Sequence, residues 1–463
     1  MPFVSINPAS GDVINRFPDT APDDVEHLMT RAHAAFDDWR CRSIEERGDA
    51  FRRAAAGLRA NRDRYAEAIT TEMGKPIAEA RAEVEKCAWA CEYFAGETAS
   101  YLSDVSLPST ARESYVEYQP LGLILAIMPW NFPFWQVFRF AAPALMAGNG
   151  TIVKHSPNTP QSALCIAEVF DEAGFPAGLY TNLFVAPEVA DDLLLDDRIA
   201  AGTLTGSTRA GSEVAASAGR AVKKMVLELG GSDPFIVLAD ANLDEAVAVG
   251  VRARFQNTGQ SCIAAKRFLI EEAIADEFQQ RFVAAVEALS IGNPLDPQTQ
   301  IGPLAREDLR DNLVRQVEES VAMGAQVLTG GQALDRPGYY YAPTVLTDVR
   351  PGMPVFQEET FGPVAPLIRV RDADEAICLA NETRYGLGSN LWTRDTDRAK
   401  DLARRIAAGN VFINGMTASD PRLPFGGIKK SGYGRELSAF GIHEFTNIQT
   451  VWIGPAQQPP SSE

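Results

Sequence analysis

Short, unbroken apolar segments alternate with amphipathic ones from residue 121 onward, and this alternation constrains the fold more than any other feature of the sequence. Residues 121–128 are typical of a buried strand, and residues 134–145 predict a helix directly after it. Further strands are expected at 151–153, 180–185 and 200–205, with a helix at 161–172. Strands this apolar belong to parallel sheets that helices cover on both faces. The sequence therefore predicts an α/β fold.

A second α/β series begins near Gly230. Its expected strands lie at 234–238, 267–270, 364–369 and 410–414, and its expected helices at 243–255 and 278–289. Residues 22–100 show helical periodicity ahead of both series. Because 463 residues exceed one ordinary compact domain, we expect two parallel-sheet, Rossmann-like lobes with a cleft between them.

Two predicted strands fall outside these series. Residues 113–119 alternate like a strand but interrupt the first lobe, and residues 447–452 lie near the C-terminus. We expect them to pair with each other and to present an edge to another subunit. The polar, Pro-containing tail at 457–463 is expected to be disordered.

The composition excludes several classes of function. The net charge of −18 repels phosphate backbones and anionic lipid, which argues against nucleic-acid and membrane-surface roles. The N-terminus has neither a basic region nor an apolar core of a signal peptide, and the longest apolar run is too short to span a bilayer. Six cysteines in so long a chain do not form a disulfide framework, and no histidine stands at ligand spacing from Cys87 and Cys91. The sequence predicts a reduced, cytoplasmic protein without a metal site.

Cys262 is the candidate nucleophile. It follows Asn257-Thr258-Gly259-Gln260-Ser261 in a Gly-bearing polar loop between a predicted helix and a predicted strand, where a thiol can be exposed. The reactive form is the thiolate, so a site around it must favour ionisation. From the loop alone, a buried and inert cysteine remains the alternative.

Glu228 and Asn131 are candidate partners for that cysteine. Glu228 stands between two leucines at the end of an apolar strand, where burial raises a carboxyl pKa and makes a usable general base. Asn131 follows the first strand at the carboxyl end of the sheet, and its amide could donate to a developing oxyanion. A salt-bridged or helix-capping glutamate and a turn asparagine are the alternatives.

The ordinary dinucleotide fingerprint G-x-G-x-x-G is absent. Instead, a strand ending at Thr205 continues into Gly206-Ser207-Thr208 and a helix expected at 214–224, so backbone N–H groups could meet a phosphate there. A further strand ends in Lys154, whose cation could meet an adenosine ribose. A solvated lysine is the alternative for Lys154.

Seven pieces of sequence together resemble the aldehyde dehydrogenase superfamily, in the order of that family and over nearly the whole chain. They are Pro-Trp-Asn-Phe-Pro at 129–133, Lys154, Gly-Ser-Thr at 206–208, Glu-Leu-Gly-Gly at 228–231, Gly-Gln-Ser-Cys at 259–262, Glu-Glu-Thr-Phe-Gly-Pro at 358–363, and Pro-Phe-Gly-Gly-Ile-Lys-Lys-Ser-Gly-Tyr-Gly-Arg-Glu at 424–436. Any one of them could arise by chance, whereas seven in order are highly specific.

The resemblance implies oxidation of an aldehyde to a carboxylate through a thioester on Cys262. Glu228 would activate the hydrolytic water, and Asn131 would hold the oxyanion together with the Cys262 backbone N–H. The implied contacts of an NAD or NADP cofactor are Trp130, Lys154, Ser156, Pro157, Gly206, Ser207, Leu229, Glu359 and Phe361. A relative that deacylates with coenzyme A would not need Glu228, so hydrolysis is expected.

The family architecture implies a division of the chain. Residues 1–100 and 122–229 would form the cofactor-binding domain, and residues 230–442 the catalytic domain. Residues 101–121 and 443–456 would form bridging strands of a homodimer or homotetramer.

Succinate-semialdehyde dehydrogenases are the most similar members, which implies a substrate with a carboxylate. Arg139 shares a helix face with Trp135 and Asn131 and matches an arginine that those enzymes use for the carboxylate. Ser419 matches another substrate contact, and Phe425 is placed beside them. Gln256 stands where those enzymes commonly carry a second arginine, and Arg422 is the candidate to replace it. An exposed, purely structural Arg139 is the alternative.

Pro157 stands where many members carry a glutamate that binds the ribose hydroxyls and repels a 2′-phosphate. Lys154, His155 and Ser156 around it offer one cation and two possible donors, so the sequence favours NADP slightly over NAD. A broad-range or amino-aldehyde dehydrogenase, and a catalytically silent family member, remain alternative functions. Arg139 disfavours a cationic substrate, and retention of Cys262 with Glu228 disfavours a silent one.

Overall fold

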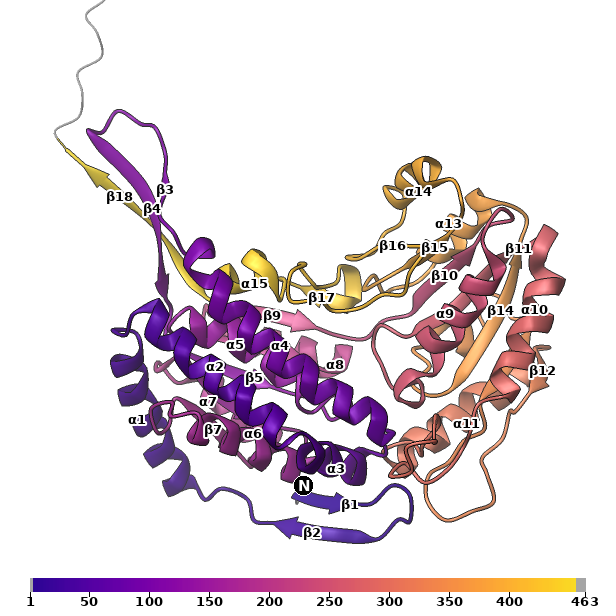
Figure 1. The fold of residues 1–463 in the computed structure, drawn as a ribbon, viewed down its shortest axis with the longest axis horizontal. Coiled ribbons are helices and arrows are strands. Elements are labelled where there is room, and N and C mark those ends of the chain that lie inside the picture. Colours follow the sequence, from indigo (N-terminus) through magenta and orange to yellow (C-terminus); the bar gives the residue numbers. More distant parts are fainter. Residues whose placement is uncertain (1–2, 455–463) are drawn as a thin grey trace, which may run out of the picture.

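The computed structural model describes residues 3–454 and consists of two α/β lobes and a projecting β arm (Figure 1). The α/β class predicted from the sequence is confirmed. The predicted disordered tail at 457–463 lies outside the described residues.

The first lobe is built on a six-stranded sheet. Its strand order is β17 (Gly432–Tyr433), β9 (Lys224–Glu228), β8 (Ile199–Thr205), β5 (Leu123–Ile127), β6 (Gly150–Lys154) and β7 (Tyr180–Leu183). All pairs are parallel except that of β17 with β9. The buried strands β5 and β6 follow from the continuous apolar runs, because both of their faces are covered by helices.

Helices surround this sheet. They are α1 (Pro22–Trp39), α2 (Ile44–Ala60), α3 (Arg62–Met73), α4 (Ile77–Tyr101), α5 (Trp135–Met146), α6 (Pro160–Glu172), α7 (Pro187–Leu195) and α8 (Thr208–Arg220). The N-terminal hairpin β1 (Phe3–Ile6) and β2 (Val13–Phe17) packs beside α6. Cys87 and Cys91 are buried on α4, in agreement with their interpretation as core residues.

The second lobe is built on a seven-stranded sheet. Its order is β12 (Gln326–Thr329), β13 (Thr344–Thr347), β14 (Val364–Val370), β11 (Ala265–Glu271), β10 (Asp233–Val237), β15 (Asn390–Trp392) and β16 (Phe412–Ile413). Its helices are α9 (Leu243–Phe255), α10 (Glu272–Glu287), α11 (Glu307–Ala322), α12 (Pro354–Gln357), α13 (Ala373–Asn381) and α14 (Thr396–Ala403). The 3₁₀ segment η1 (Gln256–Gly259) connects α9 to the loop that carries Cys262.

The two strands that the sequence left outside both lobes pair with each other, as predicted. β18 (Thr446–Ile453) runs antiparallel to β4 (Glu113–Pro120), and β3 (Val105–Ser106) completes the arm on the other side of β4. The arm projects away from both lobes (Figure 1). Ile448 and Trp452 on its edge strand are 61% and 52% exposed. No helix among residues 3–454 has both the length and the apolar character that crossing a membrane requires.

Two sequence predictions differ from the structure. The helix predicted at 214–224 ends at Arg220, and Lys224 instead begins β9. Val222 between them has a φ of +56°, which no helix interior accommodates.

The second difference concerns the boundary between the lobes. Phe425, Leu437 and Ile442 were assigned to the catalytic domain, but they are buried in the core of the first lobe, and β17 joins its sheet. The chain returns to the first lobe after β16, where these apolar side chains pack into the hydrophobic core. The helix α15 (Ser438–Glu444) follows and leads into β18.

Candidate active site

Cys262 lies at the end of a tightly constrained loop. Asn257 and Thr258 both have a φ of +54°, and Gly259 follows at +74°. A left-handed conformation is rare for a β-branched residue such as Thr258, and the surrounding structure holds it there. The Thr258 hydroxyl accepts a hydrogen bond from the Gly302 N–H at 3.1 Å, and Glu79 of α4 accepts one from the Asn257 N–H at 2.6 Å. The loop is therefore fixed from both lobes.

The backbone of Cys262 is oriented by Lys266. The Lys266 ammonium donates to the carbonyl oxygens of Ser261 at 2.9 Å and of Cys262 at 2.6 Å. In a trans peptide the N–H points opposite to the carbonyl, so the Cys262 N–H points away from Lys266. It has no acceptor within residues 3–454 and is free to donate to an oxyanion.

Asn131 lies beside this loop, as predicted. Its Nδ2 donates to the Gln260 carbonyl oxygen at 3.1 Å, and its own carbonyl accepts from Asn257 Nδ2 at 2.9 Å. An amide nitrogen carries two hydrogens, so the second one remains available. This contact supports Asn131 as the second oxyanion donor.

The thiol of Cys262 is protonated at neutral pH in this state. Burial raises its pKa to about 12, opposed by the charges of Arg139 and Lys266. Glu359 and Glu228 act in the other direction. The attack on an aldehyde therefore requires a group that takes the thiol proton.

Glu228 ends β9 in a fully buried position. Burial is the main cause that raises its pKa well above the ordinary carboxyl value, and the nearby Glu436 raises it further, while Arg139 opposes both. Neither of its oxygens has a hydrogen-bond partner within residues 3–454. A Cβ on Gly426 would stand 2.8 Å from Glu228 Oε1, so the glycine leaves the room that this carboxyl occupies. A buried carboxyl without a partner is suited to hold and move a proton.

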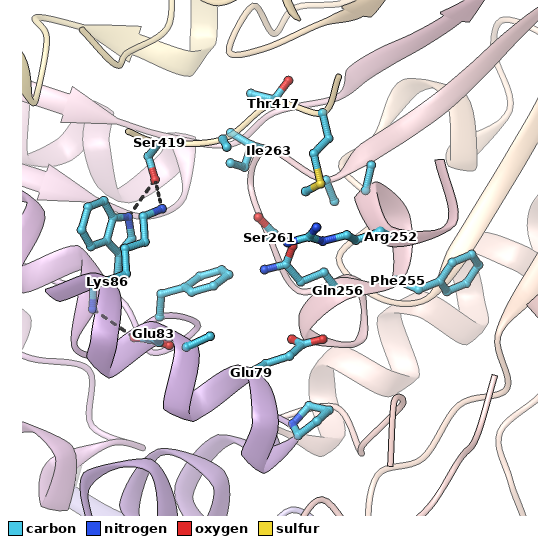
Figure 2. Close-up of a pocket in the computed structure, with 18 of the residues that line it drawn as sticks. Glu79, Glu83, Lys86, Arg252, Phe255, Gln256, Ser261, Ile263, Thr417 and Ser419 are labelled. Atoms are coloured by element: carbon cyan, nitrogen blue, oxygen red, sulfur yellow. Dashed lines mark hydrogen bonds between the residues drawn. The ribbon is translucent and has the colours of Figure 1, made fainter. Parts of the chain in front are cut away.

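A cavity of about 810 Å³ opens beside Cys262, between the two lobes (Figure 2). The predicted substrate residues Trp135, Arg139, Ser419 and Phe425 all line it. Gln256 lines it as well. Two further lining residues, Lys86 and Arg252, were not predicted from the sequence.

Arg139 borders the cavity, but its charge is already matched. Its Nε forms an ion pair with the Glu436 carboxylate, and both side chains are 2% exposed. The Phe425 ring lies 4.9 Å from its guanidinium carbon. This geometry favours a positioning role over direct binding of a substrate carboxylate.

Arg422 does not replace the arginine missing at Gln256. Its guanidinium is bonded to Asp420 at 2.6 Å, is largely exposed and does not line the cavity. Asp420, two residues earlier, fixes it outward. Arg252, on α9 and four residues before Gln256, lines the cavity in addition to Arg139.

The predicted cofactor residues gather at the carboxyl ends of β6 and β8, the usual ligand edge of a parallel sheet. Lys154 is 8% exposed, and its ammonium has no hydrogen-bond or ion-pair partner within residues 3–454. A buried cation in this position fits the ribose and phosphate of a dinucleotide. Ser207 caps α8, accepting from the Ala210 N–H at 3.2 Å, so that helix begins at Thr208, six residues before the predicted start at 214.

His155 differs from its expected role as a phosphate donor. It is fully buried, its Nε2 bonds the Pro133 carbonyl oxygen at 3.0 Å, and its Nδ1 accepts from the Ser156 N–H at 3.0 Å. Burial lowers its pKa to about 4, so the ring is neutral. The Ser156 hydroxyl is bonded to Asn158 at 2.6 Å. Lys154 alone remains as the cation near Pro157.

Glu359 and Phe361 lie on the other side of the catalytic loop. Glu359 accepts from the Gly231 N–H at 3.0 Å and pairs with Lys266 at 3.2 Å. The Phe361 ring meets the Trp130 ring edge-on at 5.7 Å.

Arg254, which the sequence analysis missed, ties this segment to the Cys262 loop. Its guanidinium donates to the carbonyl oxygens of Gly259 at 3.3 Å and Thr360 at 3.1 Å. The only sequence signal is a basic residue in the last turn of a helix, which is common on surfaces.

Comparison with known proteins agrees with this geometry. The model of the aldehyde dehydrogenase family matches residues 2–451. The chain belongs to the aldehyde dehydrogenase family. This confirms the resemblance noted in the sequence, and the protein is an NAD(P)-dependent aldehyde dehydrogenase.

Similar relatives extend over almost the whole of this aldehyde dehydrogenase. A probable succinate-semialdehyde dehydrogenase [NADP(+)] of Synechocystis sp. is 52% identical, over 98% of this chain and 100% of its own. The succinate semialdehyde dehydrogenase [NAD(P)+] of Escherichia coli K12 is 51% identical, over 97% of both chains. The solved succinic semialdehyde dehydrogenase of Streptococcus pyogenes, in complex with NADP+, superposes with a TM-score of 0.96 at 36% identity, covering 98% of this chain and 100% of the other.

Proposed function

We propose that this aldehyde dehydrogenase oxidises succinate semialdehyde to succinate, with NADP as the cofactor. The observation that carries the proposal is the cavity that the Cys262 thiol shares with the cationic side chain of Lys86. A four-carbon aldehyde with a terminal carboxylate presents its aldehyde carbon to Cys262 and its carboxylate to this cation. The names of the relatives at about half identity, and the NADP-bound neighbour, support the same substrate and cofactor.

The first half-reaction forms a thioester. The Cys262 thiol gives its proton to water in the cavity as its sulfur attacks the aldehyde carbon, and the resulting oxyanion accepts hydrogen bonds from the Cys262 N–H and Asn131 Nδ2. The cofactor supplies a hydride acceptor. Lys154, the N-terminus of α8 and Glu359 would hold the cofactor. The rings of Phe361 and Trp130, which meet edge-on, would border it. Loss of the hydride leaves the acyl group on Cys262.

The second half-reaction releases the acid. Glu228 takes a proton from a water molecule, whose oxygen attacks the thioester carbon, and the Cys262 sulfur leaves. The raised pKa of Glu228 makes its carboxylate a stronger base than an exposed one. A family member that transferred the acyl group to coenzyme A would have no use for this base.

The cofactor preference rests on Pro157. A proline carries no charge to repel a 2′-phosphate, and the buried Lys154 is close in sequence. The Pro157 carbonyl accepts from the Val4 N–H at 3.1 Å, so β1 holds this turn in place. The absence of a carboxylate at position 157, close to the Lys154 cation, favours NADP.

Assembly and location are proposed from the arm and the composition. The exposed apolar side chains on β18 and its free edge support association into a homodimer or homotetramer. The cytoplasmic location predicted from the sequence stays a prediction.

Steady-state kinetics with a panel of aldehydes test this function. We expect kcat/KM for succinate semialdehyde to exceed that for butanal and for an amino-aldehyde by about a hundredfold, with NADP preferred to NAD. Two charge-assisted hydrogen bonds are sufficient for a difference of roughly this size. Equal kcat/KM values across the panel would instead indicate a broad-range enzyme. Cys262→Ala serves as the inactive control.

A further inference from the structure

Three side chains from separate elements meet on one wall of the cavity (Figure 2). The Ser419 hydroxyl oxygen accepts a hydrogen bond from Lys86 Nζ of α4 at 2.9 Å and another from Trp135 Nε1 of α5 at 2.9 Å. The Lys86 ammonium also lies 4.1 Å from the centre of the Trp135 ring. Ser419 belongs to the loop after β16, so the cluster joins both lobes.

The hydrogen bonds of this cluster leave donors unused. An ammonium and an indole N–H can only donate, so Ser419 accepts twice and must donate its own proton elsewhere. No acceptor for that proton lies within residues 3–454. Lys86 uses one of its three N–H groups on Ser419, and no carboxylate in the described part of the chain lies within ion-pair distance of it. Three donors are thus available for one anionic group.

The other cations of the cavity are less suited to bind that group. Arg139 is paired with Glu436. Arg252 is exposed on the solvent side, where water screens its charge. Lys86 is half-buried and Ser419 is buried.

We propose that the Lys86 ammonium and the Ser419 hydroxyl receive the carboxylate of the substrate, and that Lys86 determines the preference for carboxylate-bearing aldehydes. This rests on the proposed function and assigns its specificity to a residue of α4. Trp135 is a positioning residue, since it binds Ser419 from the opposite side and stacks beneath the ammonium.

Binding of a carboxylate by Lys86 should depend on pH, because burial and charged neighbours shift the pKa of its ammonium. Burial, together with the charge of Arg139 on α5, lowers the pKa of Lys86 to about 8. Cys87 and Glu83 on its own helix and Asp420 on the facing loop act in the opposite direction. The ammonium form binds a carboxylate, so selectivity for succinate semialdehyde over butanal should be high below pH 8 and fall above it.

The test compares Lys86→Met with Arg252→Met. Both remove one positive charge from the same cavity, so their difference separates direct contact from general attraction. The readout is the ratio of kcat/KM for succinate semialdehyde to kcat/KM for butanal. We expect Lys86→Met to lower this ratio by about ten- to a hundredfold, the range of a charge-assisted hydrogen bond, and Arg252→Met to lower it by less than about threefold.

Lys86→Arg supplies a second readout that does not depend on the folding of the methionine variant. An arginine keeps its charge at all accessible pH values, so its selectivity should stay flat from pH 7 to 9.5 while that of the wild type falls. The inhibition constant of succinate against butanal should show the same pattern. Equal pH profiles for wild type and Lys86→Arg would overturn the inference.

The results for the wild type and for Lys86→Met separate the role of Lys86 from the proposed substrate. A wild-type enzyme that oxidises butanal as well as succinate semialdehyde overturns both. A wild type that discriminates, combined with a Lys86→Met variant that keeps the discrimination, overturns the role of Lys86 alone.

Discussion

The buried ion pair between Arg139 Nε and Glu436 Oε2 joins α5 to the segment that leads from β17 into α15. Arg139 also faces Glu228 and Cys262, since its charge opposes the rise in the pKa of both groups. The pair therefore places one compensated cation beside the proposed base and the proposed nucleophile.

Breaking this pair should cost stability and activity without changing selectivity. We expect Arg139→Met to lower the free energy of unfolding by about 3–5 kcal/mol, because Glu436 is left buried and unpaired. Arg139→Met with Glu436→Gln should recover a large part of it, as measured by urea unfolding. Both succinate semialdehyde and butanal should lose kcat/KM to a similar extent. A rise in KM for the semialdehyde alone would make Arg139 a direct carboxylate ligand, as the sequence first indicated.

The resting thiol of Cys262 should react slowly. With a pKa of about 12 against about 8.5 for a free thiol, its thiolate fraction at pH 7.5 is roughly three thousandfold lower. Alkylation by iodoacetamide, followed by mass spectrometry of the peptide that contains Cys262, should be slower than that of exposed Cys41 and should accelerate with pH. Labelling of Cys262 ahead of Cys41 at neutral pH would contradict this state of the thiol.

Glu228 should make folding stability depend on pH in a defined direction. Its folded pKa is raised, so between the unfolded value of about 4.3 and the folded value the native state binds the extra proton. Stability of the wild type should therefore fall, relative to Glu228→Gln, as pH rises above about 4.3. Chemical denaturation of the two proteins from pH 5 to 9 measures the difference. A difference that stays constant over this range would mean that the carboxyl is not destabilised by burial.

Cofactor selection should respond to a single carboxylate at position 157. Pro157→Glu places a negative charge where a 2′-phosphate would lie, which should lower kcat/KM for NADP by at least about tenfold and leave NAD much less affected. Pro157→Gln is the matched control, since it changes the backbone restriction without adding charge. Equal losses for NADP in both variants would assign the preference to the shape of the turn.

Local patterns predicted the fold closely. The helix predicted at 243–255 coincides with α9, and the isolated segments 113–119 and 447–452 pair as β4 and β18. Both results follow from hydrophobic periodicity, which depends on near neighbours in sequence. The helix after Ser207 was extended too far because its last residues, up to Lys224, carry no local signal of the turn at Val222.

Contacts between residues far apart in the chain could not be predicted from the sequence. Gln256 and Arg422 drew attention by their positions, yet Lys86 and Arg252 line the cavity because α4 and α9 turn those faces toward it. Glu436 ends the last of the seven segments that resemble the family, and only the fold shows that it pairs with Arg139. Such contacts join residues hundreds of positions apart, so no spacing along the chain encodes them.

The most direct test of the account is the mass of Glu228→Gln after mixing with succinate semialdehyde and NADP. If Cys262 carries the acyl group and Glu228 drives its hydrolysis, the variant should release one equivalent of NADPH in a burst and then stall. Intact-protein and peptide mass spectrometry should then show one succinyl group on the peptide containing Cys262, absent from Cys262→Ala. A stalled enzyme without an adduct, or a burst followed by turnover at the wild-type rate, would contradict the mechanism.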